Sequence, residues 1–461
     1  MNRLLYAVII SLIILSAGNC SKKDAPGDPY PTDSLGKINR WILDSMQRYY
    51  LWSDEIPAHP DYSLSPELFF KSLLSAKDRF SWVSSGGSVP GSTTTYFTYG
   101  FQYALVAATG YNGYIGVVTM VNTGGAADKA GLQRGSCFTQ LNGSVINEQN
   151  KNTVIQQLKT TGQVTVTPAV YDGVSWVSSS PVTLNSKYAG ENAVHATRIF
   201  TEGGITTGYL FYNSFDENYD ASLLQAFNKL KQASVSELIL DLRYNAGGSV
   251  ATSAKMAAMI AKNITENATW VIFEGNKQEG RKVRSLQAIV NTSANSNGKQ
   301  YADLVARRLS LQRVFILTTA ATYSAAELIV NNLKPYIDVV QIGETTSGKD
   351  EASFLVEDYR VPKQVMWKMQ PTMYKVFNSN NVGKYDRGIS PLYPVNEISQ
   401  LPLFNIGSVA DPLVNKALQI IYGSNLPDTF TALRIRSHFL QVLPVYRSAE
   451  NESSILSVIK P

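Results

Sequence analysis

The hydrophobic pattern is most regular in the second half of the chain, where predicted strands and helices alternate. Val314–Thr318 and Tyr336–Ile342 are apolar, β-branched runs that predict strands, and Ala325–Lys334 between them predicts a helix stopped by a proline. Upstream, Ser236–Leu242 predicts a strand and Ala251–Lys262 an alanine-rich helix. Alternation at this spacing is typical of crossover units and predicts an α/β core.

The pattern is different in the remaining segments. Helical spacing of apolar residues predicts one helix over residues 38–49 and a second over 66–74. From about 96 to 182, short β runs alternate with Gly and Asn turns around one short helix, which predicts a small β-rich domain. The polar stretch 278–300 predicts an inserted surface loop, and 412–422 a last helix.

Composition excludes several classes of function. The 461 residues are 44% hydrophobic and 17% charged, as in ordinary globular proteins, and the formal charge of +5 includes no basic run beyond Lys22-Lys23. Nucleic-acid binding therefore has no support. The three His residues are scattered and only two Cys are present, so a metal centre and a His-based triad are poorly supported, and we expect no cofactor.

The first residues predict export. Arg3 precedes an apolar run too short to span a membrane comfortably, and small residues lead to Cys20, so residues 1–19 resemble a bacterial lipoprotein signal that leaves Cys20 lipidated. An uncleaved anchor and plain secretion are the alternatives. Residues 20–35 predict a tether, and the expected location is the bacterial cell envelope. Cys137 then has no partner, and we expect it to be a small buried residue.

Ser324 stands at the predicted start of a helix, and two interpretations compete for it. Ser324-Ala-Ala-Glu327 is a capping box, in which both side chains satisfy backbone N–H groups. The same helix start offers free N–H groups and a positive dipole end to an oxyanion that develops beside the hydroxyl. Capping and catalysis would compete for one oxygen.

Lys349 also has rival interpretations. Residues 343–349 follow a predicted strand and match the phosphate-loop spacing G-x-x-x-x-G-K. Asp350 stands where that motif needs Ser or Thr for magnesium, and the residues beyond it do not predict a helix, so a nucleotide-dependent enzyme is disfavoured. A solvated loop lysine is the commonest role of any single Lys.

Three ordered motifs resemble the C-terminal processing (tail-specific) serine peptidases, which use a Ser-Lys dyad. Residues 322–327 match their T-A-S-A-S-E motif, residues 343–349 match G-x-x-T-x-G-K, and residues 241–248 give D-L-R-x-N-x-G-G in full. The resemblance implies a crotonase-like (ββα) peptidase core, with Ser324 as nucleophile and Lys349 as base.

The resemblance also implies the supporting residues. The backbone N–H groups of Ala325, Gly247 and Gly248 would hold the oxyanion, and glycine suits close approach of backbone. Asp241 and Arg243 are expected to brace this loop. The family often has Gln four residues after its Lys; Ser353 stands there and is the possible orienter of the dyad.

The β-rich segment resembles the PDZ domain of these peptidases, through G-G-A-A-D-K-A-G-L-Q-R-G at residues 124–135. Such a domain binds an extended peptide end as an added strand. By resemblance, Tyr99, Gly100 and Phe101 would form the loop that binds the peptide carboxylate. Residues 78–82, which precede this domain, resemble a segment of Bacteroidetes family members, and we expect their aromatic side chains to belong to the core.

The sequence therefore predicts an α/β serine endopeptidase with a polypeptide substrate and a lipid-anchored N-terminus; it does not indicate an oligomeric state. The rival function is a lipid-anchored protein that holds peptides without turnover. After the signal and tether, the predicted domains are a helical N-terminal unit (36–92), a PDZ-like domain (96–185), a peptidase core (190–400) and a C-terminal helical extension (401–461).

Overall fold

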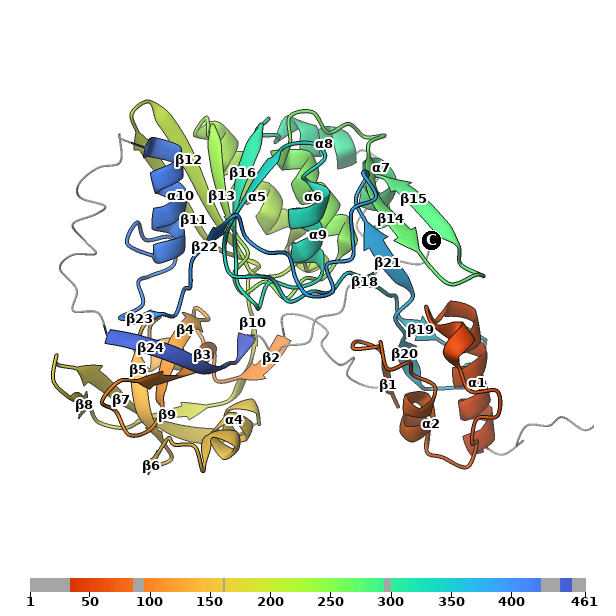
Figure 1. The fold of residues 1–461 in the computed structure, drawn as a ribbon, viewed down its shortest axis with the longest axis horizontal. Coiled ribbons are helices and arrows are strands. Elements are labelled where there is room, and N and C mark those ends of the chain that lie inside the picture. Colours follow the sequence, from red (N-terminus) through yellow and green to blue (C-terminus); the bar gives the residue numbers. More distant parts are fainter. Residues whose placement is uncertain (1–33, 86–94, 161, 294–299, 424–439, 450–461) are drawn as a thin grey trace, which may run out of the picture.

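The structure, a computed structural model, describes residues 34–85, 95–160, 162–293, 300–423 and 440–449 (Figure 1). The predicted signal segment, Cys20 and nearly all of the predicted tether lie outside these residues. Within the described ranges, every helix is too short or too polar to cross a membrane.

A six-stranded sheet forms the centre of the largest part of the molecule (Figure 1). The strand order is β11-β12-β13-β16-β17-β22, parallel from β12 onward, with β11 as an antiparallel edge. The bounds are β11 Val194–Glu202, β12 Ile205–Tyr212, β13 Glu237–Asp241, β16 Arg313–Thr318, β17 Asp338–Gly343 and β22 Tyr393–Pro394.

Helices cover both faces of this sheet, as the continuous apolar strands require. Successive residues of β13 point to opposite faces, and Leu238 and Leu240 enter one buried cluster while Ile239 enters another. The first cluster is shared with α5 (Asp220–Gln232), α6 (Val250–Ile260) and α9 (Ala325–Asn332), and the second with α10 (Pro412–Tyr422). The predicted α/β core is confirmed, and the helix expected to reach Lys334 ends two residues earlier.

The parallel strands end at one edge of the sheet. Asp241 ends β13 opposite Leu317, and Thr318 ends β16 opposite Gly343, the last residue of β17. The three segments with motif resemblance begin or end at this edge. Loops at the carboxyl ends of parallel strands meet outside the sheet, which is where such folds place their functional sites.

The β-rich segment forms a separate lobe below the core (Figure 1). Its main sheet has the order β23-β24-β3-β4-β5-β7-β8, in which β23 (Gln400–Leu401) and β24 (Leu440–Arg447) come from the last part of the chain. It holds two helices rather than the single one predicted, because the polar surface of α4 hides its three buried residues, Val154, Ile155 and Leu158. The bounds are β2 Thr95–Thr98, β3 Phe101–Ala108, β4 Ile115–Val121, α3 Ala126–Lys129, β5 Cys137–Leu141, β6 Ser144–Val145, α4 Lys151–Lys159, β7 Gln163–Tyr171, β8 Trp176–Ser178, β9 Val182–Asn185 and β10 Lys187–Gly190.

The N-terminal unit packs α1 (Ser34–Tyr49) against α2 (Pro66–Ser72) and ends in strand β1 (Trp82–Ser84). β1 pairs with β20, so later segments complete this unit. The remaining elements are η1 Ser53–Glu55, η2 Glu217–Tyr219, β14 Thr269–Glu274, β15 Arg281–Ser285, α7 Leu286–Val290, α8 Gln300–Ala306, β18 Glu351–Ala352, β19 Val356–Glu357, β20 Lys368–Gln370, β21 Tyr374–Phe377 and β23 Gln400–Leu401.

Two expectations about surface segments are wrong. Residues 278–300 are not a plain loop: β15 pairs with β14, and α7 follows it. The last part of the chain is not only helical, because β24 (Leu440–Arg447) joins the sheet of the β-rich lobe. β15 forms a hairpin with β14, whereas β24 gains its hydrogen bonds from a strand that is distant in the sequence, and the polar or mixed composition of each gave no sign of a strand.

Candidate active site

Ser324 lies at a sharp turn between β16 and α9. Its backbone has φ +59° and ψ −117°, a conformation that is rare for residues other than glycine and costs of order 1–3 kcal/mol. The turn is held from both sides: the Tyr323 N–H donates to the Asn245 carbonyl at 3.0 Å, and the Leu328 N–H donates to the Ser324 carbonyl at 2.9 Å. Enforced backbone strain clusters at functional sites, which supports a functional role for this serine.

The Ser324 hydroxyl is not consumed by capping. Glu327 accepts the Ser324 N–H at 2.8 Å and the Ser324 side chain faces the Glu327 N–H, so the predicted capping box is present. The approach of the Glu327 N–H is not a full hydrogen bond, and the buried Oγ makes none to any residue that the structure describes. The oxygen is therefore available for another partner.

Glu327 joins the serine turn to the lysine loop. Besides the Ser324 N–H, its carboxylate accepts the Thr346 hydroxyl at 2.6 Å, the Gly348 N–H at 2.6 Å and the Lys349 N–H at 2.8 Å. Burial raises the pKa of the Glu327 carboxyl, and these hydrogen bonds oppose the shift. The sequence showed Glu327 only as a capping residue, because its other donors lie in a distant loop.

Lys349 is buried, with 3% of its surface exposed, so the alternative interpretation as a solvated loop lysine is wrong. Its ammonium lies 4.7 Å from the centroid of the Phe80 ring and 5.3 Å from that of the Tyr323 ring. Burial lowers the pKa of Lys349 to about 8, against the opposing effect of nearby carboxylates, of which Glu351 is the strongest.

The acidic residues that follow Lys349 are bound by other cations. Lys375 donates to Asp350 at 2.8 Å and to Glu351 at 2.5 Å, and Arg79 lies 4.0 Å from Glu351. These partners offset the negative charge that would otherwise hold Lys349 protonated.

The phosphate-loop interpretation of residues 343–349 is wrong. A phosphate loop opens a helix, whereas the residues after Lys349 form strand β18. Gly348 and Lys349 also donate their N–H groups to Glu327, where a phosphate would need them.

Phe80 reaches this site from the N-terminal unit. Its ring meets the Tyr323 ring edge to face, with centroids 5.8 Å apart, and the neighbouring Arg79 donates to the Gly348 carbonyl at 2.5 Å. We expected the aromatic residues here to be core, but Phe80 is only half-buried and faces the Lys349 ammonium. Arg79 and Gly348 are 269 residues apart, a separation that no local pattern can bridge.

The glycine loop, which contains Gly247 and Gly248 and follows β13, packs directly on the turn at Ser324. A Cβ on Gly247, which has φ +89°, would lie 2.6 Å from the Ser324 Cβ and 2.9 Å from the Ala325 nitrogen, so only glycine fits. The Gly247 N–H donates to the Asn245 side chain at 2.8 Å and is already engaged. The N–H groups of Gly248 and Ala325 have no hydrogen-bond partner among the described residues.

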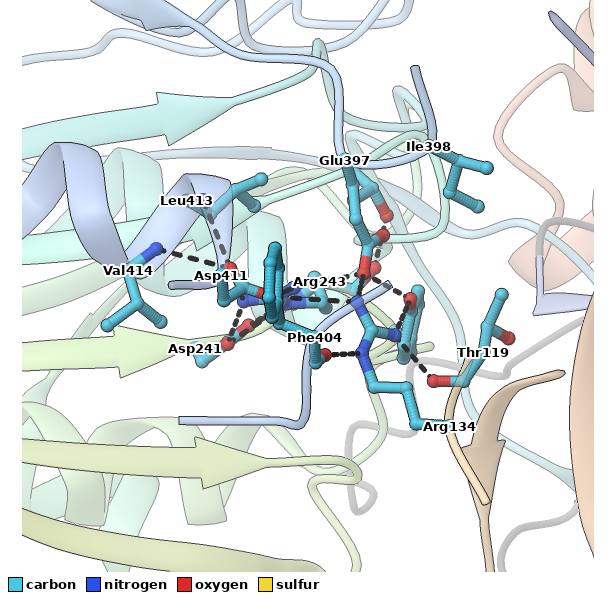
Figure 2. Close-up of polar contacts among 12 residues, drawn as sticks. Thr119, Arg134, Asp241, Arg243, Glu397, Ile398, Phe404, Asp411, Leu413 and Val414 are labelled. Atoms are coloured by element: carbon cyan, nitrogen blue, oxygen red, sulfur yellow. Dashed lines mark hydrogen bonds and ion pairs between the residues drawn. The ribbon is translucent and has the colours of Figure 1, made fainter. Parts of the chain in front are cut away.

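A buried ion network braces this loop from behind (Figure 2). Arg243 is fully buried and donates to Asp241 and Asp411 at 2.7 Å each and to Glu397 at 2.9 Å. Arg134 of the β-rich lobe lies 2.5 Å from Glu397 and so ties that lobe to the network. Asp241 and Arg243 support the loop from its buried side, as we expected.

Two further predicted residues are placed as follows. Ser353 is buried, and its Oγ accepts a hydrogen bond from the Gln370 side chain at 2.8 Å, so a glutamine amide stands beside the position where the family often has one. Cys137 is buried with a free thiol, and burial raises its pKa to about 12, in agreement with a structural role.

Residues Tyr99, Gly100 and Phe101 lie at the start of β3 in the β-rich lobe. Gly100 has φ +80°, and a Cβ there would approach the Gly125 Cα to 3.0 Å. The Tyr99 carbonyl accepts the Ala127 N–H at 2.9 Å, which folds this loop against α3.

Within the described ranges, no cluster of three or more His, Cys, Asp or Glu side chains could hold a metal ion.

The core, with its three motif segments, and the N-terminal unit match one family. Residues 206–393 match peptidase family S41 and residues 37–82 match the peptidase S41 N-terminal domain, and the two matches cover just over half of the chain. The chain belongs to peptidase family S41. The resemblance that the motifs predicted is confirmed.

The similar proteins are described as serine proteases, in agreement with this family. Proteins described as CtpA-like serine proteases are 26% identical over 223 residues in Staphylococcus epidermidis strain RP62A and 24% identical over 233 residues in Staphylococcus aureus strain N315. These regions are 48% and 50% of this chain, but only 40% and 41% of the relatives' own length. An S41 protease structure from Bacteroides fragilis superimposes with a TM-score of 0.68 at 27% identity, over 86% of this chain and 99% of that chain. The mixed α/β fold with several sheets is therefore similar to that of an S41 protease.

Proposed function

We propose that this S41 family member is a serine endopeptidase that cleaves polypeptides by acyl transfer, with Ser324 as nucleophile and Lys349 as general base. The observation that carries the proposal is the Glu327 carboxylate, which accepts the backbone N–H groups of both residues and fixes them on one scaffold. A buried lysine with a pKa of about 8 is partly neutral at pH 7, as a base must be.

The proposed reaction has two halves. Neutral Lys349 takes the hydroxyl proton while the Ser324 oxygen forms a bond to the peptide carbonyl carbon, whose π electrons move onto oxygen. The intermediate collapses, the C–N bond breaks, and the Lys349 ammonium returns the proton to the leaving amine. Water then attacks the ester with Lys349 again as base, which releases the acid and restores Ser324.

The oxyanion would be held by backbone N–H groups at the start of α9 and in the glycine loop. The free N–H groups of Ala325 and Gly248 favour these two as donors. Gly247 could contribute only after it exchanges its hydrogen bond with Asn245. Ser353, itself held by Gln370, is the proposed orienter of the dyad.

The remaining parts are assigned by the same resemblance. We propose a crotonase-like core over residues 190–400, a PDZ-like domain over 96–185 that receives polypeptide ends, and a lipid anchor on Cys20 that holds the protein in the cell envelope. The glycine at position 100, whose backbone only glycine accommodates, supports a peptide-carboxylate loop formed with Tyr99 and Phe101. Stronger binding of a peptide acid than of the matching amide would support that loop.

The test is hydrolysis of an unfolded protein by the chain from Ser21 onward, beside Ser324→Ala and Lys349→Ala, with mass spectrometry of the products. Cleavage that disappears in both variants, while their melting curves stay cooperative, is the expected result. Cleavage that survives either substitution would refute the assigned roles.

One observation favours the rival function, a protein that binds peptides without turnover. The Gly247 N–H, an expected oxyanion donor, is already bound to Asn245. Peptide binding without cleavage by the parent protein would support this alternative.

A further inference from the structure

Strand β24, near the end of the chain, adds to the free edge of β3 in the β-rich lobe (Figure 1). The two strands are antiparallel, with Arg447 opposite Ala104. Beyond the strand, the Ser448 N–H donates to the Tyr103 carbonyl and its Oγ accepts the Tyr103 N–H, both at 2.9 Å. β24 therefore runs toward residues 99–101, the polarity with which a polypeptide end would approach that loop.

The side chain of Tyr446 fills the space between β3 and α4. Its ring centroid lies 5.7 Å from that of Tyr103 on β3, and the Lys159 ammonium at the end of α4 lies 5.9 Å from the Tyr446 ring. We call the backbone edge of β3 with Tyr103 and Lys159 the β3–α4 groove. An aromatic side chain in this groove gains both ring packing and a cation–π contact.

β24 is held less completely than the strands around it. Leu443 and Val445 are 68% and 37% exposed, whereas β4 is buried along nearly its whole length. Pro444 has no N–H to donate, and the register shifts between Pro444 and Tyr446. On its other side, among the described residues, β24 pairs with the two residues of β23, and the Val442 N–H donates to the Ser399 carbonyl at 3.0 Å. These features are those of a strand that another polypeptide can replace.

A second contact links β24 to the proposed dyad. The Arg447 guanidinium binds both carboxylate oxygens of Glu344, one of them at 3.0 Å. Glu344 follows β17 in the loop that carries Lys349, and its N–H donates to the Thr318 carbonyl at 2.9 Å. Any segment that removes β24 from the groove also removes Arg447 from the lysine loop.

We propose that the β3–α4 groove is the recognition site for an extended polypeptide segment with an aromatic residue followed by a basic one, and that β24 is its resident intramolecular ligand. An incoming polypeptide displaces β24 and breaks the Arg447–Glu344 ion pair. This inference rests on the proposed function, because it assigns recognition and self-occupancy to the PDZ-like domain of that peptidase.

The experiment uses a fluorescein-labelled peptide with the sequence of residues 440–449 and the chain from Ser21 onward carrying Ser324→Ala, which prevents cleavage. Probe affinity is measured for this parent and with Tyr446→Ala, Arg447→Ala or Leu443→Ala added. Leu443 is the matched control, because its side chain lies on the same strand but points to solvent.

The first two substitutions weaken the resident strand, so we expect them to tighten probe binding at least tenfold, while Leu443→Ala changes it less than twofold. Lys159→Ala added to Arg447→Ala should weaken the probe at least threefold. Equal affinity in all variants would show that β24 is a permanent strand and would overturn the inference.

A second measurement needs no substitution in β24 or in the groove. In the Ser324→Ala parent, excess probe should accelerate amide exchange of residues 440–447, because the displaced strand loses its hydrogen bonds. Unchanged exchange at saturating probe would also overturn the inference. Because both readouts use a protein without its nucleophile, probe binding can succeed while hydrolysis fails, and the reverse, so the two proposals fail separately.

Discussion

Replacement of Lys349 by Met should remove activity and yet stabilise the folded protein at neutral pH. The side chain is buried, and burial lowers its pKa from 10.5 to about 8. A fall of this size corresponds to about 3 kcal/mol by which the folded state disfavours the protonated amine. Met has similar length and no charge, so the variant avoids this penalty.

The sign and the pH window follow from linkage. Below pH 8 both the folded and the unfolded protein bind the proton, and the parent carries the whole penalty. Between pH 8 and 10.5 the unfolded state binds more protons, so the stability of the parent rises with pH. The advantage of the variant should therefore be about 3 kcal/mol at pH 7, about 2 kcal/mol at pH 9 and below about 1 kcal/mol at pH 10.

The loss of cation–π contacts with Phe80 and Tyr323 reduces the advantage by about 1–2 kcal/mol over the range in which the folded-state amine is charged. Paired urea titrations at pH 7, 9 and 10 would measure the difference. Lys375→Met is the control with the opposite sign, because it leaves Asp350 and Glu351 buried without their cation.

The same pKa gives a catalytic prediction. At pH 7 roughly a tenth of Lys349 is neutral with a pKa of about 8, which is roughly 300-fold more than with a pKa of 10.5. The kcat/KM of the parent should rise tenfold per pH unit below pH 8 and then level off. For the stability prediction, the reasoning would be refuted if Lys349→Met were less stable than the parent at pH 7. It would also be refuted if the difference in unfolding free energy between variant and parent were the same at every pH.

Three further substitutions test the scaffold. Gly247→Ala should lower kcat/KM at least 100-fold, because the added Cβ would lie 2.6 Å from the Ser324 Cβ. Gly204→Ala is the control, since Gly204 has a similar φ but open space around it, and it should change kcat/KM less than twofold. Equal losses of kcat/KM in the two variants would contradict this. Glu327→Gln should lower the melting temperature and should lower kcat/KM 10–100-fold, since an amide cannot accept hydrogen bonds from all four donors. An unchanged melting curve would argue against the role of Glu327 in joining the serine turn to the lysine loop. Arg243→Met should destabilise by about 3–5 kcal/mol in urea unfolding, whereas Arg360→Met, whose side chain is 52% exposed, should cost under about 1 kcal/mol.

The sequence by itself determined the alternation of strands and helices and the chemistry-bearing motifs. Strand β13 and helix α9 could be predicted because apolar periodicity is a local property that burial on a sheet demands. The nucleophile candidate could be found because it stands at a fixed place in a short motif. The predicted α/β core and family follow from these two kinds of signal.

Only the tertiary structure decided how the candidate site is held. Whether Lys349 is buried depends on Phe80 and on the Glu327 carboxylate, which come from other parts of the chain. The engagement of the Gly247 N–H by Asn245 is likewise a matter of side-chain rotamers that no spacing encodes. The pairing of β24 with β3 escaped prediction because a strand with one exposed face takes its stability from its partner, and a partner more than 300 residues away leaves no mark on the local pattern.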